Sequence, residues 1–166
     1  MTESLIKFFQ ESPMWIKELI TFIISMFPIV ELRGAVPVGV ALGIESWKLY
    51  IIAVLGNMLP IPFVLWLARP IINFFLNSRL FKKLGQWLHR KVEKNTDKIV
   101  KYGTWGLFIF VAIPLPGTGA WTGALVAALI DLRIKKAVPS ILLGVMTAGV
   151  IMLFGSNIVK FIIGLF

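Results

Sequence analysis

Cysteine is absent from this chain of 166 residues, and histidine occurs only once. Without cysteine there is no disulfide bond, thiolate nucleophile or cysteine-based metal site. The single histidine, His89, lies in a basic polar segment without a second histidine, and we expect a solvated surface residue. The sequence also lacks a nucleotide-binding loop, a metal-ligand cluster and a serine nucleophile with a histidine partner. We therefore expect neither an enzyme nor a bound cofactor or metal.

Acidic residues are scarce, because 8 of them stand against 17 lysines and arginines, which gives a formal net charge of +9. In a soluble protein this balance would suggest nucleic acid as a partner. Here 58% of the residues are hydrophobic and the mean hydropathy is +0.88, values typical of an integral membrane protein. We therefore expect a multi-pass protein of the plasma membrane, with membrane lipids and no nucleic acid among its partners.

Eight of the basic residues lie in one segment between apolar stretches. This pattern is typical of a cytoplasmic loop that follows the positive-inside rule, and its apolar residues have the spacing of an amphipathic surface helix. The N-terminal MTESLIKFFQES has too short an apolar run for a cleavable signal peptide, but it predicts a short helix in the membrane interface. The eight basic residues are Arg79, Lys82, Lys83, Arg90, Lys91, Lys94, Lys98 and Lys101.

The most informative stretch is ELRGAVPVGVALG, which starts at Glu31. Its two charged residues, Glu31 and Arg33, interrupt an apolar region, although a charge at membrane depth costs about 2.5–3.5 kcal/mol. Pro28 and Pro37 are expected to break helices. Each uncharged arm has about a dozen residues, or ~18 Å, and is too short to cross ~30 Å of hydrocarbon. We therefore predict a re-entrant hairpin over residues 14–45, whose irregular backbone is surrounded by protein or a cavity.

The second half repeats this order of features. Residues 102–130 are uncharged and are interrupted by PLPGTG, and the charged exit that follows contains Asp131 and Arg133. Gly56 in the first half corresponds roughly to Gly144 in the second. The order of the features, rather than sequence identity, is the evidence for an internal repeat.

The predicted fold is all-α and membrane-integral, an inverted repeat of a re-entrant helical hairpin plus a transmembrane helix. A re-entrant second hairpin keeps the bases of its exit on the same side as the basic loop, and the first hairpin then enters from the opposite face. A bundle of four or five plain spans is the alternative. The predicted segments are a first repeat over 1–77 with its hairpin at 14–45 and transmembrane helix at 49–68, a basic cytoplasmic connector over 78–101, and a second repeat over 102–166 with its hairpin at 102–130 and transmembrane helix at 137–159.

Three residues inside the first predicted transmembrane helix need a partner or a local change of geometry. Pro60 and Pro62 are two residues apart and are expected to kink the helix. Asn57 is expected to bond a neighbouring helix or the carbonyls near the Pro60 break.

A resemblance to a known family follows from two motifs. ELRGAVPVGVALG in the first half and IPLPGTGAWTGAL in the second resemble the small multidrug export protein family, which resembles the wider DedA superfamily of membrane proteins. The resemblance covers nearly the whole chain and implies paired re-entrant hairpins. It also implies movement of polyprenyl phosphate lipid carriers across the membrane, with proton coupling. The second hairpin of DedA proteins typically carries arginines around its proline, whereas residues 113–129 contain none.

We expect a substrate site between the two hairpin tips. Arg33 is expected to hold an anionic group, and Glu31 to change protonation or engage a cation, because apolar surroundings favour a neutral carboxyl group. The alternative is a structural ion pair. The second-hairpin residues either line the site beside helix ends and open carbonyls or only pack. The predicted substrate-binding residues are Glu31, Arg33, Pro37, Pro114, Pro116, Thr118, Trp121 and Thr122, with Glu31 also coupling protons.

The predicted function is transport of a small molecule or of a lipid-linked anion similar to polyprenyl phosphate, with protons as the coupling ion. One alternative is a small multidrug exporter of cationic compounds. Another is a non-transporting membrane scaffold, in which Glu31 and Arg33 have only a structural role. We also expect a homodimer, because about 80 residues per half are little material to enclose a cavity, and small-residue faces such as GVALG permit close helix contact.

Overall fold

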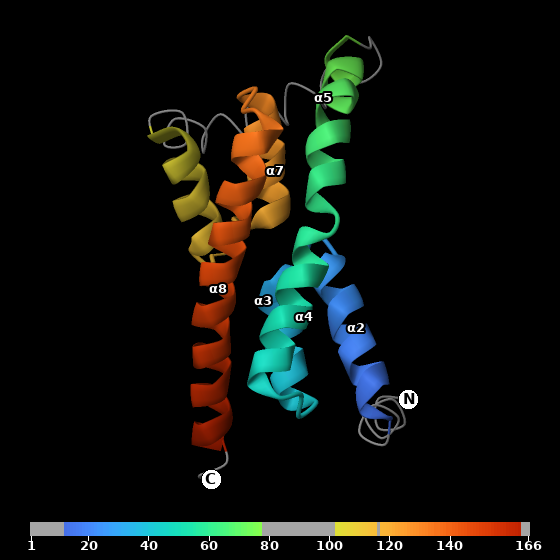
Figure 1. Cartoon of the computed structure of the whole chain (residues 1–166), viewed down its shortest axis with the longest axis vertical. Helices are drawn as coiled ribbons and strands as arrows, with labels where there is room; N and C mark the ends of the chain where they lie inside the picture. The colour runs from blue at the N-terminus through green and yellow to red at the C-terminus, as the bar shows by residue number, and fades with distance from the viewer. Residues whose placement is uncertain (1–11, 78–101, 116, 164–166) are drawn as a thin grey trace. The chain divides into compact units, whose positions relative to one another are not determined.

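The computed structural model describes residues 12–77, 102–115 and 117–163. Within these ranges the regular structure is α-helical, without a strand (Figure 1). The predicted interfacial helix over 3–11, the basic connector with His89, and Pro116 lie outside the described residues. The helices are α2 (Met14–Met26), α3 (Glu31–Ala41), α4 (Ser46–Met58), α5 (Ile61–Asn77), a helix over Tyr102–Ala112, α7 (Ala120–Leu129) and α8 (Ile134–Ile163).

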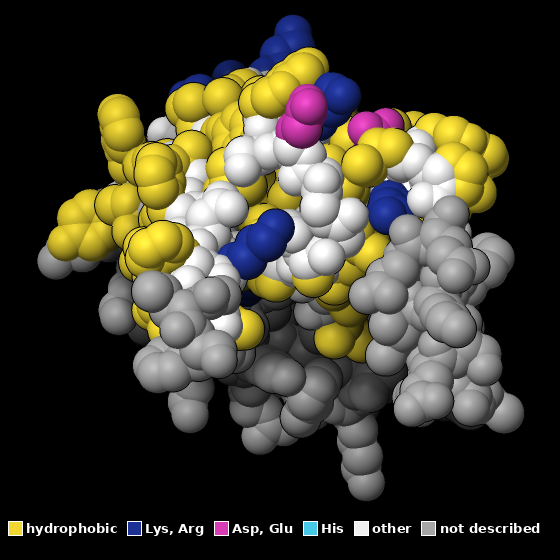
Figure 2. Space-filling view, turned by 90° about the horizontal axis from the view of Figure 1, so that it is seen from below, with side chains coloured by type: hydrophobic (Ala, Val, Ile, Leu, Met, Phe, Trp, Pro, Cys, Tyr) yellow, Lys and Arg dark blue, Asp and Glu magenta, His cyan; other side chains and the backbone are white. Residues whose placement is uncertain are grey.

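Two segments of the described chain are long and apolar enough to cross a membrane. Ser46–Ala68 has a mean hydropathy of 2.1, and Ile134–Ile163 has a mean hydropathy of 2.2. Each starts three residues before the predicted transmembrane helix, at 49 and at 137. Apolar side chains cover much of the described surface in Figure 2, as expected where lipid is the solvent. The all-α prediction is confirmed for the described residues, which contain two candidate membrane spans, and the re-entrant hairpins and the inverted repeat stay predictions.

The prolines act differently from one another. Pro28 lies in the turn between α2 and α3, as predicted, but Pro37 lies inside α3, so the prediction of a break there is wrong. The ring of Pro37 removes one N–H, and helices in membrane proteins tolerate such a loss where neighbours satisfy the backbone. Pro62 is in the first turn of α5, where a helix N–H has no intrahelical partner in any case.

The chain divides into two compact units, of which unit 1 comprises Met1–Leu59 and Met146–Phe166. In unit 1, α2, α3 and α4 pack against one another in pairs. Small residues allow this approach, because a Cβ at Gly39 would collide with Leu49, and a Cβ at Gly56 would lie 2.6 Å from the Phe22 carbonyl oxygen. α2 and α4 are therefore in backbone contact.

Two buried polar side chains on α2 complete this packing. The Ser25 hydroxyl donates to the Ala53 carbonyl of α4 at 2.6 Å, and the Thr21 hydroxyl donates to its own helix at the Lys17 carbonyl. These bonds satisfy both hydroxyl groups within an apolar layer, where an unpaired group would be costly.

The C-terminal part of α8 completes unit 1. The Tyr50 hydroxyl donates to the Met146 carbonyl at 3.1 Å, which links α4 to α8. One turn further along α8, a Cβ at Gly149 would lie 2.9 Å from the Tyr50 ring and 3.3 Å from Leu32 of α3. α8 therefore approaches both α3 and α4 through a small residue.

Unit 2 comprises Pro60–Val145 and is built in a similar way. α5 packs on α7, with Ala68 and Ala128 buried in their contact. The helix over Tyr102–Ala112 meets the first part of α8 at Gly144, where a Cβ would lie 2.9 Å from the Phe108 carbonyl oxygen. This contact has the same form as the contact of Gly56 with Phe22 in unit 1.

The turns that leave α3 and α7 also match. Gly43 (φ 78°) and Asp131 (φ 57°) each adopt a left-handed conformation after the helix end. In both turns the next amide returns to the carbonyl five residues earlier, at 3.0 Å in unit 1 and 2.9 Å in unit 2, which is the Schellman arrangement. Gly56 and Gly144 each follow thirteen residues later. The two units therefore share the turn after one helix and a close glycine contact thirteen residues later, while the inverted repeat stays a prediction.

Candidate functional site

Both charges of the ELRGAVPVGVALG motif lie in the first turn of α3. Glu31 is 5% exposed and Arg33 is half-buried. The negative charge of Glu31 attracts the positive Arg33 guanidinium. The Glu31 N–H donates to the Phe27 carbonyl at 2.9 Å, which closes the turn from α2. Glu31 has φ 50°, a conformation that costs a non-glycine residue about 1–3 kcal/mol. A buried acid therefore occupies a strained backbone position, a combination typical of functional sites.

The buried amide of Asn57 lies at the same level of unit 1 as Glu31. α3 and α4 are joined by a short turn and run antiparallel, with Gly39 packed on Leu49. Glu31 is eight residues before Gly39 and Asn57 is eight residues after Leu49, so both lie about 12 Å from that contact in the same direction. Asn57 is 2% exposed, and its Oδ1 has no hydrogen-bond partner among the described residues.

The predicted bond from Asn57 to a neighbouring helix is therefore not seen for this oxygen. A buried acceptor without a donor costs about 1–3 kcal/mol. It marks a place where a donor, such as a protonated carboxyl group, would be stabilised.

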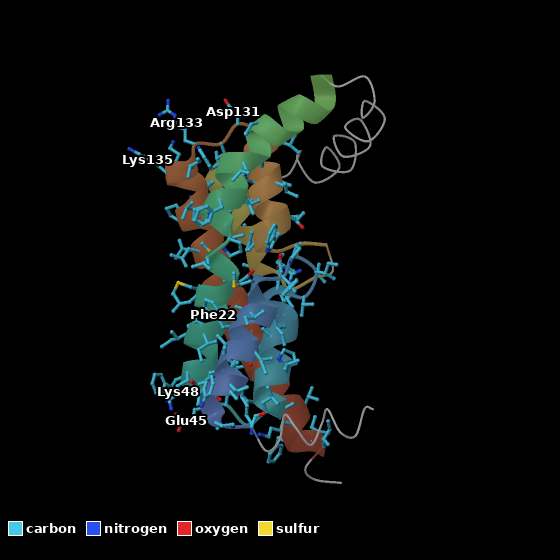
Figure 3. The ribbon with its side chains drawn as sticks, turned by 90° about the vertical axis from the view of Figure 1, so that its right-hand side faces the viewer. Phe22, Glu45, Lys48, Asp131, Arg133 and Lys135 are labelled. Carbon is cyan, nitrogen blue, oxygen red and sulfur yellow. The ribbon has the colours of Figure 1, made fainter. Side chains whose placement is uncertain are left out.

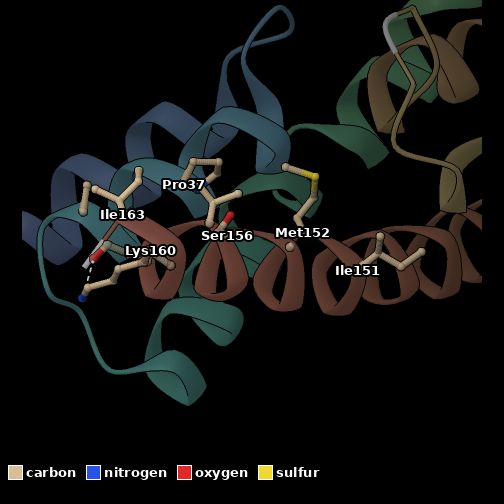
Figure 4. Close-up of a pocket in the computed structure, with 10 residues that line it drawn as sticks. Pro37, Ile151, Met152, Ser156, Lys160 and Ile163 are labelled. Carbon is tan, nitrogen blue, oxygen red and sulfur yellow. Dashed lines mark hydrogen bonds between the residues drawn. The ribbon is translucent and has the colours of Figure 1, made fainter. Parts of the chain in front are cut away.

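An apolar groove runs between α3 and the C-terminal part of α8 in unit 1. Its volume is about 590 Å³, and it is lined by Pro37, Val40 and Ala41 of α3 and by side chains between Ile151 and Ile163 of α8. Among the described residues that line it, Ser156 and Lys160 are the polar ones. The Lys160 ammonium group donates to the Val40 carbonyl at 3.4 Å across one end of the groove (Figure 4).

The predicted site residues Arg33 and Pro37 belong to one side of α3, because residues four apart on a helix share a face. Pro37 lines the groove, and its missing N–H removes one helical hydrogen bond from the Arg33 carbonyl. The α3 wall of the groove is therefore continuous with the side of the helix that carries Arg33.

The predicted residues of the second hairpin lie in unit 2, in the turn before α7 and in the first turn of that helix. The Thr118 hydroxyl lies 2.7 Å from the Ile113 carbonyl oxygen and 2.8 Å from that of Leu115, so it binds the turn that contains Pro114. Trp121 and Thr122 follow on α7, and both are half-buried. The position of Thr118 fits the packing alternative, because its hydroxyl closes its own turn.

The charged residues that follow α3 and α7 are solvent-accessible. Glu45, directly before α4, and Lys48, in the first turn of α4, form an ion pair of 3.3 Å, and both are labelled in Figure 3. Asp131, Arg133 and Lys135 gather where α7 leads into α8 (Figure 3) and are exposed, as expected for interface charges. Among the described residues, no three acidic or histidine side chains come together as a metal site.

Sequence reasoning missed Lys160 and the groove. Lys160 is the single charged residue between Ala137 and the end of the chain, a signal that is equally typical of a helix reaching the interface. The sequence shows Asn57 as a polar residue inside a predicted transmembrane helix, but its level with Glu31 depends on how α3 packs on α4.

The comparisons with known proteins agree with the motifs. Residues 31–151 match the model of the family described as "Putative small multi-drug export protein", a match that begins at Glu31 and covers well over half of the chain. No curated protein and no solved structure matches the chain. The likeness to the DedA superfamily stays a prediction. Together with two helices apolar enough to cross a membrane, the match establishes that the chain belongs to the small multi-drug export protein family, whose name is that of a membrane transporter.

Proposed function

We propose that this protein is a transporter for an amphipathic anion similar to a lipid-linked phosphate, and that Glu31 couples the transport to protons. The observation that carries the proposal is the buried pair at the start of α3, where Glu31 is 5% exposed and Arg33 is half-buried. Charges in an apolar segment are rare and usually mark a substrate or ion pathway.

Arg33 is the proposed anion contact. Its guanidinium stays protonated under ordinary conditions, and its planar fork matches phosphate or carboxylate with two hydrogen bonds. The groove beside Pro37 supports an amphipathic substrate, because a hydrocarbon chain fits its apolar wall while the anionic group reaches Arg33 on the same side of α3.

Glu31 is the proposed proton carrier, with Asn57 as the partner of its neutral form. When Glu31 is protonated, its hydroxyl is a donor at the level where the Asn57 Oδ1 lacks one. When Glu31 is ionised, its charge attracts the Arg33 guanidinium and competes with an anionic substrate. Proton and anion are therefore expected to bind cooperatively, each increasing the affinity for the other by the same factor.

Among the described residues of unit 1, the other charged side chains lie away from this turn. α2 and α4 carry theirs at the ends remote from Glu31, and α8 carries Lys160 beside the opposite end of α3. These residues are Lys17, Glu18, Glu45, Lys48 and Lys160.

A second candidate is export of cationic compounds, which the description of the family favours. Glu31 would then bind the cation directly, and Arg33 would orient the carboxylate. The two candidates differ in which residue contacts the substrate.

Ligand-dependent thermal stabilisation of the purified protein separates them. We expect a polyprenyl phosphate to raise the melting temperature, more at acidic than at alkaline pH, because only the neutral form of Glu31 leaves the Arg33 guanidinium available to the anion. Arg33→Lys should lose most of this effect, because the bidentate contact is lost although the charge is kept. Stabilisation by a quaternary ammonium drug that disappears in Glu31→Gln would favour the second candidate. If neither ligand stabilises the protein and both variants melt at lower temperature, the pair is structural.

A further inference from the structure

The groove between α3 and α8 has the properties of a hydrocarbon-binding surface. A Cβ placed at Gly155, in the middle of the α8 wall, would have no atom within 4 Å, so the space is open. The neighbouring lining residues Ile151 and Val159 are 46% and 56% exposed. Water is not stabilised against these apolar walls, because they offer it no hydrogen-bond partners. An apolar chain would restore the dispersion contacts that the open walls lack.

One end of the groove carries a positive charge. Lys160 has three donors on its ammonium group, and it uses the Val40 carbonyl, a neutral acceptor, at 3.4 Å. Glu45 is the first acidic residue after Val40 in the chain. Its Oε2 lies 3.3 Å from the Nζ of Lys48, with which it forms an ion pair. The groove therefore combines an apolar wall with a cation at its mouth, a charge complement for an anionic headgroup.

The position of Lys160 along α8 gives the orientation of the occupant. α8 has 30 residues, about 45 Å of helix, so it extends beyond ~30 Å of hydrocarbon. Lys160 lies in its last turn, where a lysine reaches the headgroup region. Ile151 lies about 13 Å deeper along the helix. A molecule with its charge at Lys160 and its chain toward Ile151 has the orientation of a lipid in one leaflet.

We propose that this groove binds an anionic membrane phospholipid, with one acyl chain along the walls of α3 and α8 and the phosphate group at Lys160. The charge at one end supports a lipid rather than an apolar helix of a second copy, because Lys160 lies at the mouth of a groove of about 590 Å³ whose other lining residues are almost all apolar. The phosphate contact at Lys160 is separate from the proposed substrate contact at Arg33, whereas the chains of the two molecules would share the apolar wall of the groove and compete for it.

Native mass spectrometry of the full-length protein, exchanged from detergent into mixed micelles, tests the proposal. The probes are phosphatidylglycerol and phosphatidylcholine with identical acyl chains. We expect wild type to prefer phosphatidylglycerol, and Lys160→Gln to bind it about fivefold more weakly while phosphatidylcholine binding changes little. Lys135→Gln is the matched control, because it removes an exposed lysine of the same helix outside the groove.

A second variant tests the chain rather than the headgroup. Gly155→Leu starts a side chain in the open space of the groove, where a Cβ would have no atom within 4 Å. Leucine also favours a helix more than glycine, so folding is expected to be retained. Binding of both lipids should fall at least tenfold. Phe154→Leu changes the neighbouring exposed position outside the groove and should leave lipid binding as in wild type.

Three results with the groove variants and their control would overturn the lipid site. They are unchanged phosphatidylglycerol binding in Lys160→Gln, an equal loss in Lys135→Gln, and wild-type binding in Gly155→Leu. Arg33→Lys distinguishes this site from the transport site, since it should weaken the polyprenyl phosphate response and leave phosphatidylglycerol binding intact. If Arg33→Lys removes both, the groove has no separate lipid site.

Discussion

Gly56→Ala should separate α2 from α4, although it adds only one methyl group. The new Cβ would lie 2.6 Å from the Phe22 carbonyl oxygen and 3.1 Å from the Ser25 Cβ. The first neighbour belongs to the backbone of α2, so no side-chain rotation can relieve the overlap and the helices must move apart. The adjacent hydrogen bond from Ser25 to the Ala53 carbonyl, at 2.6 Å, would lengthen with them.

The expected magnitude follows from two opposing effects. Replacing a helical glycine by alanine stabilises the helix by about 1 kcal/mol, and overpacking a close contact costs about 1–3 kcal/mol. Gly155→Ala on α8 is the matched control, because a Cβ there has no atom within 4 Å and only the gain remains. Gly56→Ala should therefore be less stable than Gly155→Ala by about 1–3 kcal/mol.

Thermal unfolding in detergent, followed by circular dichroism, measures this difference. For a chain of this size, 1 kcal/mol corresponds to about 2–4 °C in Tm. Gly144→Ala should behave like Gly56→Ala, since its Cβ would lie 2.9 Å from the Phe108 carbonyl oxygen. If Gly56→Ala melts at or above the temperature of Gly155→Ala, the close backbone contact between α2 and α4 is wrong.

Three further predictions concern turns, topology and the buried amide. Gly43→Ala should lower the free energy of unfolding by about 1–2 kcal/mol, and Asp131→Gly should raise it by about 1 kcal/mol, because both positions have a positive φ. Stabilisation by Gly43→Ala or destabilisation by Asp131→Gly, measured by thermal unfolding, would contradict the matching turns. Single cysteines at Ser46 and Lys136, both exposed, should be labelled from opposite sides of the membrane, and labelling from one side would exclude an inverted repeat. Asn57→Leu should raise the free energy of unfolding by about 1 kcal/mol, since a buried acceptor without a donor is removed, and it should weaken the pH dependence of transport; a loss of stability would show that the Asn57 amide is satisfied.

The sequence was sufficient to predict the class of protein and the buried acid. Glu31 interrupts a long apolar region, and such a position implies burial whatever the detailed fold. The turn at Pro28 and the short arms around it were also predictable, because proline and chain length act locally. The continuation of α3 through Pro37 was not, since it depends on how neighbouring helices support a helix that has lost one hydrogen bond.

The remainder of the site depends on contacts between distant residues. Lys160 donates to the Val40 carbonyl, which is 120 positions away in the chain. The sequence around either residue does not indicate this hydrogen bond. The level shared by Glu31 and Asn57 follows from the packing of Gly39 on Leu49, which a sequence pattern does not determine. Glycines at positions 56 and 144 were predicted to correspond, but their role in backbone contact required the structure.

The most direct test of proton coupling is flux of polyprenyl phosphate into proteoliposomes over a pH series, with melting curves on the same samples. When Glu31 is neutral, it no longer attracts the Arg33 guanidinium, which is then available to bind the anionic substrate. Wild-type transport should therefore increase as the pH falls. Glu31→Gln keeps the shape of a neutral carboxyl group and removes the titration, so it should retain substrate binding and lose most of the pH dependence. A well-folded Glu31→Gln protein with the pH dependence of wild type would contradict the assignment of Glu31 as the proton carrier.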